Sequence, residues 1–381
     1  MSDGKLLTLP LADFTRRLSA ALPPLIRVLL SPDLRVHPKW GQYLPFDVAS
    51  YGKNASRGHA CRPDIVLTAN GPRIVEMDFV ASGRGSTISG LPLESDRLAY
   101  LQTFTDWYHS MGVNRVHYAT GTVTTCRKGA DQFAAAMRQY LGFDITSINI
   151  DETPTPSGTL VDRLFYWSEI KKPLDTQDLM LSTAEPWIDS KMVFALVHDP
   201  AMTDVLEPMI GTDNLAFLRE IFPATYTLET GIPLVTDQAG WLIKSSRVEE
   251  DYSWGSRSVV LGHQYSSAIW QAALKGINPP DKTLGRHPIL QRYVPSEDFR
   301  PIWDAGVENR VHVRRRLTGP GGTPQEFQPA NQAVNGRIGI SFLVESRNGQ
   351  VFTPPVGLLT LRQDPLAHIT PDAMVTPFRI V

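Results

Sequence analysis

The feature that most constrains this chain is a pair of strand-like runs within residues 62–78 that meet at an Asn-Gly turn. Side chains alternate between the two faces of a strand, so Glu76 and Asp78 point to the same side. In a suitable register Asp64 lies opposite Glu76, and Arg62 lies opposite Asp78. The hairpin would then carry three carboxylates and one guanidinium on a single face.

The length of the connecting loop decides this register. A three-residue loop of Ala69, Asn70 and Gly71 gives the opposed pairs, whereas a two-residue Asn-Gly loop would set Asp64 opposite Met77 and scatter the cluster. Carboxylates brought together without partners repel one another, and a hard divalent cation such as magnesium relieves that repulsion. The hairpin therefore predicts either a magnesium site or a polar face that is simply solvated.

Composition sets limits on the class of protein. A chain of 381 residues exceeds the usual size of one domain, which indicates one large multi-lobed fold or several subdomains. Hydrophobic residues make up 42% and the formal net charge is −2, so a basic surface for nucleic acid is not expected. Two cysteines give no disulfide framework, and prolines and charges interrupt the apolar stretch 18–30, which we expect to be helical on either side of Pro23 and Pro24. We expect a cytoplasmic protein without a membrane span.

The pattern of elements predicts an α+β fold. After the hairpin, residues 92–112 and 128–140 have the spacing of amphipathic helices, and strand-like runs follow each of them. Beyond residue 301 the pattern becomes mainly β. We expect an N-terminal α/β region (1–155), a middle region (156–300) and a C-terminal β-rich region (301–381).

A second feature is a lysine at the end of a short apolar strand, Gly-Trp-Leu-Ile-Lys244. A small-residue loop follows it and contains Gly255, Ser256 and Arg257. An ammonium on a rigid strand can hold phosphate oxygens while the amides of a loop cover them. The alternative is a solvated surface lysine. Together with the carboxylates, however, this lysine makes up the second half of a nucleotide triphosphate site, and residues 291–294 (Gln291 to Val294) would supply the hinge for an adenine.

Several of these motifs resemble a known family. The pattern Arg62-x-Asp64 followed by Glu76-x-Asp78 is similar to the Arg-x-Asp…Glu-x-Asn pattern of glutathionylspermidine synthase and its relatives, the circularly permuted ATP-grasp ligases. The later landmarks that look like this family are Ile-Phe-Pro at 221–223, the Lys244 strand and its loop, 291–294, and Gly-Leu-Leu-Thr-Leu-Arg at 357–362. The resemblance spans roughly residues 60–370 and implies a circularly permuted ATP-grasp-like fold whose antiparallel sheets carry the metal and nucleotide sites.

The resemblance also implies an activity and roles for particular residues. ATP would phosphorylate a substrate carboxylate, and an amine would attack the acyl phosphate to form an amide, with ADP released. The metal ligands would be Asp64, Glu76 and Asp78 for Mg²⁺; the ATP-binding residues would be Lys244, Gly255, Ser256, Arg257, Gln291 and Val294; the catalytic residue would be Arg62, and the substrate contacts would be Ser82, Arg84 and Arg362. The partners would be small-molecule carboxylates and amines. An ion pair with Asp78 is the alternative for Arg62, and a solvated glycine turn is the alternative for residues 82–86.

The chain departs from the family in ways that keep other functions open. Asp78 stands where the family usually has asparagine, and no lysine lies in 211–218, where a second nucleotide lysine is expected; Lys191 or Arg219 would have to replace it. A cysteine–histidine amidase domain is not recognisable. A phosphotransferase would use the same ATP groups without an amine acceptor. A catalytically silent binding protein would tolerate the loss of one lysine.

Overall fold

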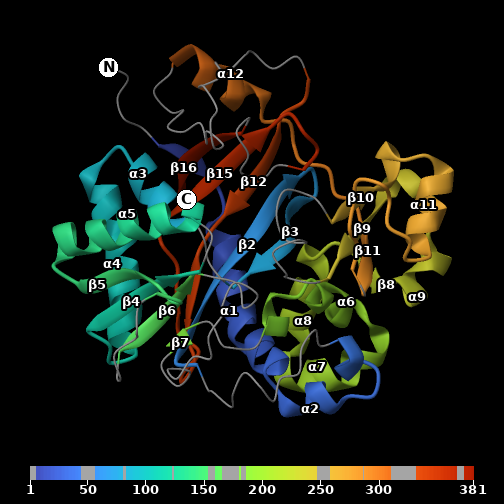
Figure 1. The fold of residues 1–381 in the computed structure, drawn as a ribbon, viewed down its shortest axis with the longest axis horizontal. Helices are drawn as coiled ribbons and strands as arrows, with labels where there is room; N and C mark the ends of the chain where they lie inside the picture. Colours follow the sequence, from blue (N-terminus) through green and yellow to red (C-terminus); the bar gives the residue numbers. More distant parts are fainter. Residues whose placement is uncertain are drawn as a thin grey trace.

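The computed structural model describes residues 6–43, 56–79, 83–121, 124–152, 159–164, 180–181, 186–246, 258–285, 287–309, 332–366 and 373–381. Within these residues the fold is a mixture of helices and three sheets. The β2–β3 hairpin lies near the centre, with α3–α5 on one side of it and the β8–β11 sheet on the other (Figure 1). The α+β expectation is confirmed at this level.

The largest sheet has eight strands drawn from both ends of the chain. Its order is β1-β16-β15-β12-β2-β13-β14, and β3 pairs with the other edge of β2. The strands span β1 (Leu7–Leu9), β2 (Gly58–Thr68), β3 (Gly71–Asp78), β12 (Asn335–Gly339), β13 (Phe342–Glu345), β14 (Val351–Phe352), β15 (Val356–Arg362) and β16 (Met374–Ile380). The long strand β2 is therefore flanked by β3 on one side and by β12 and β13 on the other.

The hairpin has the register that groups the polar residues, but it reaches this register through a different loop. Thr68 pairs with Gly71, so the loop consists of Ala69 and Asn70 and is neither the three-residue loop nor the two-residue Asn-Gly loop considered from the sequence. A shift in register between Asp64 and Ile65 leaves Val75 as an extra residue on β3. This bulge restores the expected pairs, Asp64 with Glu76 and Arg62 with Asp78. The alternation of side chains in the sequence could not reveal the bulge, because the extra residue of the bulge compensates for the shorter loop and leaves the same residues opposite one another.

The second sheet is parallel and lies against helices. Its order is β5-β4-β6-β7, with β4 (Arg115–Thr120), β5 (Asp144–Asn149), β6 (Leu160–Leu164) and β7 (Met180–Leu181). Its helices are α3 (Arg84–Gly90), α4 (Glu94–Ser110) and α5 (Thr124–Leu141). Aromatic residues of α4 and α5, among them Phe104, Trp107 and Phe133, form a core that includes residues of β4 and β6. The helices expected at 92–112 and 128–140 are confirmed.

The third sheet is antiparallel and carries the predicted lysine strand. Its order is β10-β9-β11-β8, with β8 (Thr225–Thr227), β9 (Trp241–Ser245), β10 (Val259–Leu261) and β11 (Pro288–Arg292). Around it lie α9 (Leu228–Gly231), α11 (Ser267–Leu274) and the 3₁₀ turns η7 (Ile232–Leu234), η8 (Gln238–Gly240) and η9 (Gly262–Gln264). Trp241 and Ile243 pack against Trp270 of α11, so the alternate residues of β9 face the opposite side.

The remaining helices do not form one layer, because α12 (Arg300–Asn309) lies apart from the others, at the opposite end of the large sheet (Figure 1). They are α1 (Ala12–Leu29), α2 (Pro32–Val36), α6 (Met192–His198), α7 (Thr203–Ile210), α8 (Thr212–Ile221) and α12 (Arg300–Asn309), with 3₁₀ turns η1 (Gly41–Tyr43), η5 (Pro186–Asp189) and η6 (Pro200–Met202). Contrary to our expectation, α1 runs continuously through Pro23 and Pro24. These prolines remove two backbone donors, but α1 buries a large apolar face that includes Leu18, Leu22 and Leu25, and this burial favours one helix. None of the described helices combines the length and apolarity needed to cross a membrane.

Candidate functional site

A large pocket lies between the hairpin and the β8–β11 sheet. Its open space is about 900 Å³, including its solvent-filled mouth. We call it the first pocket, and the described residues that line it are Asp64, Val66, Val75, Glu76, Lys191, Leu242, Lys244, Ser258, Val259, Gln291, Arg292, Tyr293, Val294, Ser296, Asn335, Gly336, Arg337, Pro365 and Leu366. Four of these side chains are basic and two are acidic, so the walls favour an anion.

Strand alternation places Lys244 in this pocket. Trp241 and Ile243 face the core, so Leu242 and Lys244 face the pocket. The ammonium of Lys244 donates a hydrogen bond of 2.9 Å to the carbonyl oxygen of Val75, the extra residue of the hairpin bulge. Burial lowers the pKa of Lys244 to about 8, although the carboxylate of Glu76 opposes that shift.

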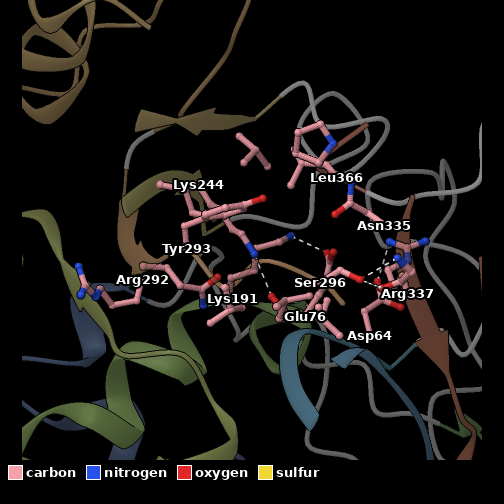
Figure 2. A pocket seen from close by; sticks show the side chains of 18 of the residues that line it. Asp64, Glu76, Lys191, Lys244, Arg292, Tyr293, Ser296, Asn335, Arg337 and Leu366 are labelled. Atoms are coloured by element: carbon pink, nitrogen blue, oxygen red, sulfur yellow. Dashed lines mark hydrogen bonds and ion pairs between the residues drawn. The ribbon is translucent and has the colours of Figure 1, made fainter. Parts of the chain in front are cut away.

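A second lysine meets Lys244 from a different element. Lys191 immediately precedes α6, and its backbone N–H donates to the carbonyl oxygen of Ser246, just after β9. Its side chain is buried and its Nζ lies 2.8 Å from Oε1 of Glu76 (Figure 2). Arg219, the other residue considered from the sequence, instead donates to the carbonyl oxygen of Val197 and the hydroxyl of Thr203. Of the two candidates, Lys191 is the one that lines the first pocket.

Glu76 forms an ion pair with Lys191 and also feels the charge of the nearby Lys244. Burial alone would raise the pKa of Glu76, but the charges of Lys191 and Lys244 outweigh it and lower the pKa to about 2. The side chain of Asp64, which lies opposite Glu76, is also buried, with Oδ2 at 2.8 Å from Nη1 of Arg337. Burial raises the pKa of Asp64, and the charges of Arg337 and Arg62 offset that shift only in part. The polar face of the hairpin is thus part of a pocket, which excludes the solvated alternative.

The three predicted carboxylates separate into a pair and a single residue. Asp64 and Glu76 line the first pocket, whereas Asp78 is not among its described lining residues and pairs with Arg62 at 3.1 Å. The described residues contain no group of three or more His, Cys, Asp or Glu arranged to hold a metal ion. Magnesium in nucleotide sites usually takes one or two carboxylates and completes its shell with phosphate and water. The pair formed by Asp64 and Glu76 fits that donor set, and a cage of three carboxylates does not.

A smaller pocket adjoins the first one. Its open space is about 410 Å³, and Asp64 and Arg337 line both pockets. We call it the second pocket; the other described residues that line it are Arg62, Gly83, Arg84, Thr87, Tyr100, Gly339, Ser341, Val356, Gly357, Leu358 and Thr360. Arg62 forms an ion pair with Asp78, which was the alternative to a catalytic role in the sequence analysis. Its Nη2 also lies 3.7 Å from Oδ1 of Asp64. It lines the second pocket as well.

The structure places the other predicted site residues as follows. Gln291 and Val294 line the first pocket, and the buried amide of Gln291 donates to the hydroxyl of Thr225 at 2.9 Å. Arg362 forms a 3.7 Å ion pair with Asp364 and is not among the described lining residues of either pocket. Residues Ser82, Gly255, Ser256 and Arg257 lie outside the described part of the chain.

Arg84 is committed mainly to the protein interior. Its two terminal nitrogens bind the carboxylate of Asp162, which also accepts a hydrogen bond from the hydroxyl of Tyr108 at 2.6 Å. The guanidinium lies within 4.8 Å of the ring centres of Phe104 and Tyr118. Its Nε nevertheless has no hydrogen-bond partner among the described residues, and the residue lines the second pocket.

Sequence reasoning did not single out Arg337. Gly339 of β12 pairs with Asp64 of β2, and Arg337 precedes Gly339 by two residues, so Arg337 and Asp64 share a face. The absence of a side chain at Gly339 makes room for Arg62, because a Cβ there would lie 3.1 Å from the Cδ of Arg62. The pairing of β12 with β2 joins residues more than 270 positions apart, and no local pattern indicates it.

The close approach of Gly339 to Arg62 gives a prediction about stability. Gly339→Ala is expected to destabilise the fold by about 1–3 kcal/mol, because Arg62 must move away from the new methyl group. Gly129→Ala is the control: it adds a methyl to α5 where nothing lies within 4 Å, and it should stabilise by about 0.5–1 kcal/mol. Urea unfolding of both variants measures these changes. Equal changes in both would contradict the close packing of Arg62 against Gly339.

The sequence matches no family model and no curated protein. Among solved structures, the chain is similar to a glutathione synthetase-like effector from Globodera pallida in its apo form. The two chains are 10% identical, and their superposition has a TM-score of 0.55 over 99% of this chain and 89% of the other. The two proteins share a fold. This similarity is compatible with an ATP-grasp-like architecture; the circular permutation and the division into three regions stay predictions.

Proposed function

We propose that this protein is an ADP-forming carboxylate–amine ligase that uses ATP and Mg²⁺, built on a circularly permuted ATP-grasp-like fold. ATP would bind in the first pocket, and the acid would bind in the second pocket beside Arg62. The name of the similar solved structure, a glutathione synthetase-like effector, supports a ligase-type site without indicating the reaction of this chain.

The convergence of two buried lysines carries this proposal. Lys191 and Lys244 come from separate elements and meet around one carboxylate, Glu76, in a pocket with an excess of basic side chains. Buried ammonium groups are costly unless they are paired, so two of them in one pocket indicate an anionic ligand of high charge. A triphosphate meets this requirement, because each lysine can donate to several phosphate oxygens.

The rest of the first pocket suits a nucleotide base. Leu242, Val259, Val294 and Leu366 give it apolar walls. The N–H groups of Arg292 and Tyr293 donate to the carbonyl oxygens of Ala224 and Gly240, which holds the end of β11 in place. A fixed segment between apolar walls can receive a planar base without reorganising.

Asp64 and Glu76 would hold the magnesium ion, whose bound charge would neutralise phosphate oxygens. Lys191 and Lys244 would hold the phosphate chain in place. Asp64 lines both pockets, so the γ-phosphate held near it would lie close to an acid in the second pocket. This shared border favours transfer between the two pockets over simple storage of a nucleotide.

The reaction would proceed in two transfers. A carboxylate oxygen of the acid attacks the γ-phosphorus, the bond to the β-phosphate oxygen breaks, and ADP leaves. An amine then attacks the acyl carbon, the amine loses a proton, and inorganic phosphate leaves. Arg62 would stabilise the charge on the transferring phosphoryl group, and its planar cation suits this role better than a lysine would.

A Glu76→Gln variant tests the proposal. In the parent, Mg²⁺ should strengthen ATP binding, and calorimetry should show this enhancement reduced roughly tenfold in the variant, because one carboxylate ligand is lost. Glu229→Gln, at an exposed position on α9, is the control and should behave as the parent does. An enhancement that is unchanged in Glu76→Gln would contradict the assigned magnesium site.

Product analysis separates the ligase from the alternatives. ADP release that requires both an acid and an amine supports the ligase, whereas release with a phosphorylated product and no amine supports a phosphotransferase. One observation favours a catalytically silent protein: the ion pairs already neutralise Asp64, Glu76 and Asp78. Absence of nucleotide binding would favour that reading.

A further inference from the structure

The second pocket has a wall of buried hydroxyl groups. Tyr100 of α4, Thr87 and Ser341 line this pocket, and all three residues are buried. Thr360 of β15 adds a fourth hydroxyl to the pocket lining. Hydroxyl groups both donate and accept, so this wall can bind hydroxyl or carbonyl groups of a ligand.

The charged residues of the second pocket are mainly basic. Arg62, Arg84 and Arg337 line it, and the buried Nε of Arg84 has no hydrogen-bond partner among the described residues. The single carboxylate in the described lining is Asp64, which is already paired with Arg337 at 2.8 Å. Arg62 and Arg84 are also paired, with Asp78 and Asp162, but neither of these carboxylates belongs to the described lining, so the charges that face the pocket are mainly positive. The lining therefore favours an anion over a free ammonium group, which would find no unpaired carboxylate among the described lining residues.

The size of the second pocket also limits its ligand. Its open space of about 410 Å³ includes solvent at the mouth. Pockets for drug-sized ligands span roughly 300–1,000 Å³, so this pocket lies near the lower end of that range. It suits an acid of a few carbon atoms better than a peptide.

We propose that the second pocket binds a small carboxylic acid that carries hydroxyl groups and has no free amino group. This inference rests on the proposed function, because it identifies the class of acid that the ligase activates. The carboxylate lies toward Arg62 and the border with the first pocket, and the hydroxyl groups of the acid face Tyr100 and its neighbours. Zwitterionic amino acids are rejected because their ammonium group would find no unpaired carboxylate in the described lining of the pocket.

Matched pairs of acids test this inference. Lactate and alanine, glycerate and serine, and malate and aspartate differ mainly by a hydroxyl in place of an ammonium group. Each is titrated by calorimetry into the full chain in the presence of Mg²⁺ and a non-hydrolysable ATP analogue. We expect at least one hydroxy acid to bind at least roughly tenfold more tightly than its amino counterpart.

Two variants assign the binding to the second pocket. Tyr100→Phe is expected to weaken binding of the hydroxy acid roughly tenfold, because a buried hydroxyl partner is lost. Tyr265→Phe removes a hydroxyl that bonds Asp281 outside both pockets, and it should have no effect. Equal effects of the two substitutions would overturn the assignment.

The outcomes for the acid and for ATP are separable. If the ATP analogue binds but the amino acids bind as tightly as the hydroxy acids, or no acid binds, the inference is overturned and the ATP site stands. If the analogue does not bind, the proposed function fails, and the same pairs are titrated without nucleotide. In that case, if a hydroxy acid still binds more tightly than its amino counterpart and Tyr100→Phe abolishes this preference, the inference is supported. If no such preference is found, the inference is overturned.

Discussion

Replacing Lys244 with methionine is expected to weaken the binding of magnesium-ATP by roughly 10- to 100-fold, because charge-assisted hydrogen bonds to phosphate are lost. The variant should still fold. Burial lowers the pKa of Lys244 to about 8, which means that the charged ammonium destabilises the folded state. Removal of this charge should therefore increase the free energy of unfolding. The loss of the hydrogen bond to the Val75 carbonyl opposes that gain. Calorimetric titration with magnesium-ATP measures the affinity.

Lys275→Met provides the matched control for this prediction. Lys275 is exposed beyond the end of α11 and does not belong to the described lining of the first pocket. Its removal changes the net charge by the same amount as the removal of Lys244. An equal loss of affinity in both variants would show that the overall charge, and not a phosphate contact, is responsible.

The largest expected effect on stability concerns His59, a buried residue of β2. Its Nδ1 has no hydrogen-bond partner among the described residues. Burial, with a smaller contribution from the positive charge of Arg163, lowers the pKa of His59 to about 3 from an ordinary value of 6.5. The unfolded chain therefore binds a proton in a pH range where the folded chain does not, and stability is lost as the pH falls from 6.5 toward 3. The loss attributable to His59 approaches about 5 kcal/mol near pH 3.

Substitution of His59 isolates this contribution from that of other groups. His59→Leu should reduce the fall in stability between pH 6.5 and pH 3, measured by urea unfolding at a series of pH values. His59→Gln serves if the leucine variant does not fold, since it also lacks a titrating group. His109→Asn, at an exposed position of α4, is the control. A fall in the His59 variants as steep as in the parent would contradict the buried neutral histidine.

Much of the hairpin could be predicted from local sequence. The even spacing within Arg62-x-Asp64 and Glu76-x-Asp78 predicts that these residues share one face, and the structure has Asp64 opposite Glu76 and Arg62 opposite Asp78. Neither loop considered from the sequence is present, since the turn is Ala69-Asn70 and a bulge at Val75 compensates for its shorter length. The carbonyl oxygen of Val75, the extra residue of the bulge, accepts a hydrogen bond from the ammonium of Lys244. Bulges depend on pairing with both neighbouring strands, and local spacing does not encode that.

The ion pairs of the hairpin could not be predicted from the sequence. Glu76 pairs with Lys191, which the sequence suggested only as one of two replacements for a nucleotide lysine, and Asp64 pairs with Arg337, which it did not suggest. Both partners are more than 100 residues away from the carboxylates along the chain. Beyond residue 301 the sequence predicted mainly β structure but no order of strands; in the structure β15 and β16 complete the large sheet, and β16 contains Pro377. Long-range pairing decides all three features. The sequence alone could therefore suggest Lys244, the carboxylates and, as one of two alternatives, Lys191, but not the ion pairs that these groups form.

The most direct test of the central claim is a crystal structure of the full chain with a non-hydrolysable ATP analogue and Mn²⁺ as a visible substitute for Mg²⁺. The account predicts the triphosphate between Lys191 and Lys244, the base beside Leu242 and Val294, and an anomalous manganese peak at Asp64 and Glu76. A nucleotide bound elsewhere, or a manganese peak remote from these two carboxylates, would contradict the account.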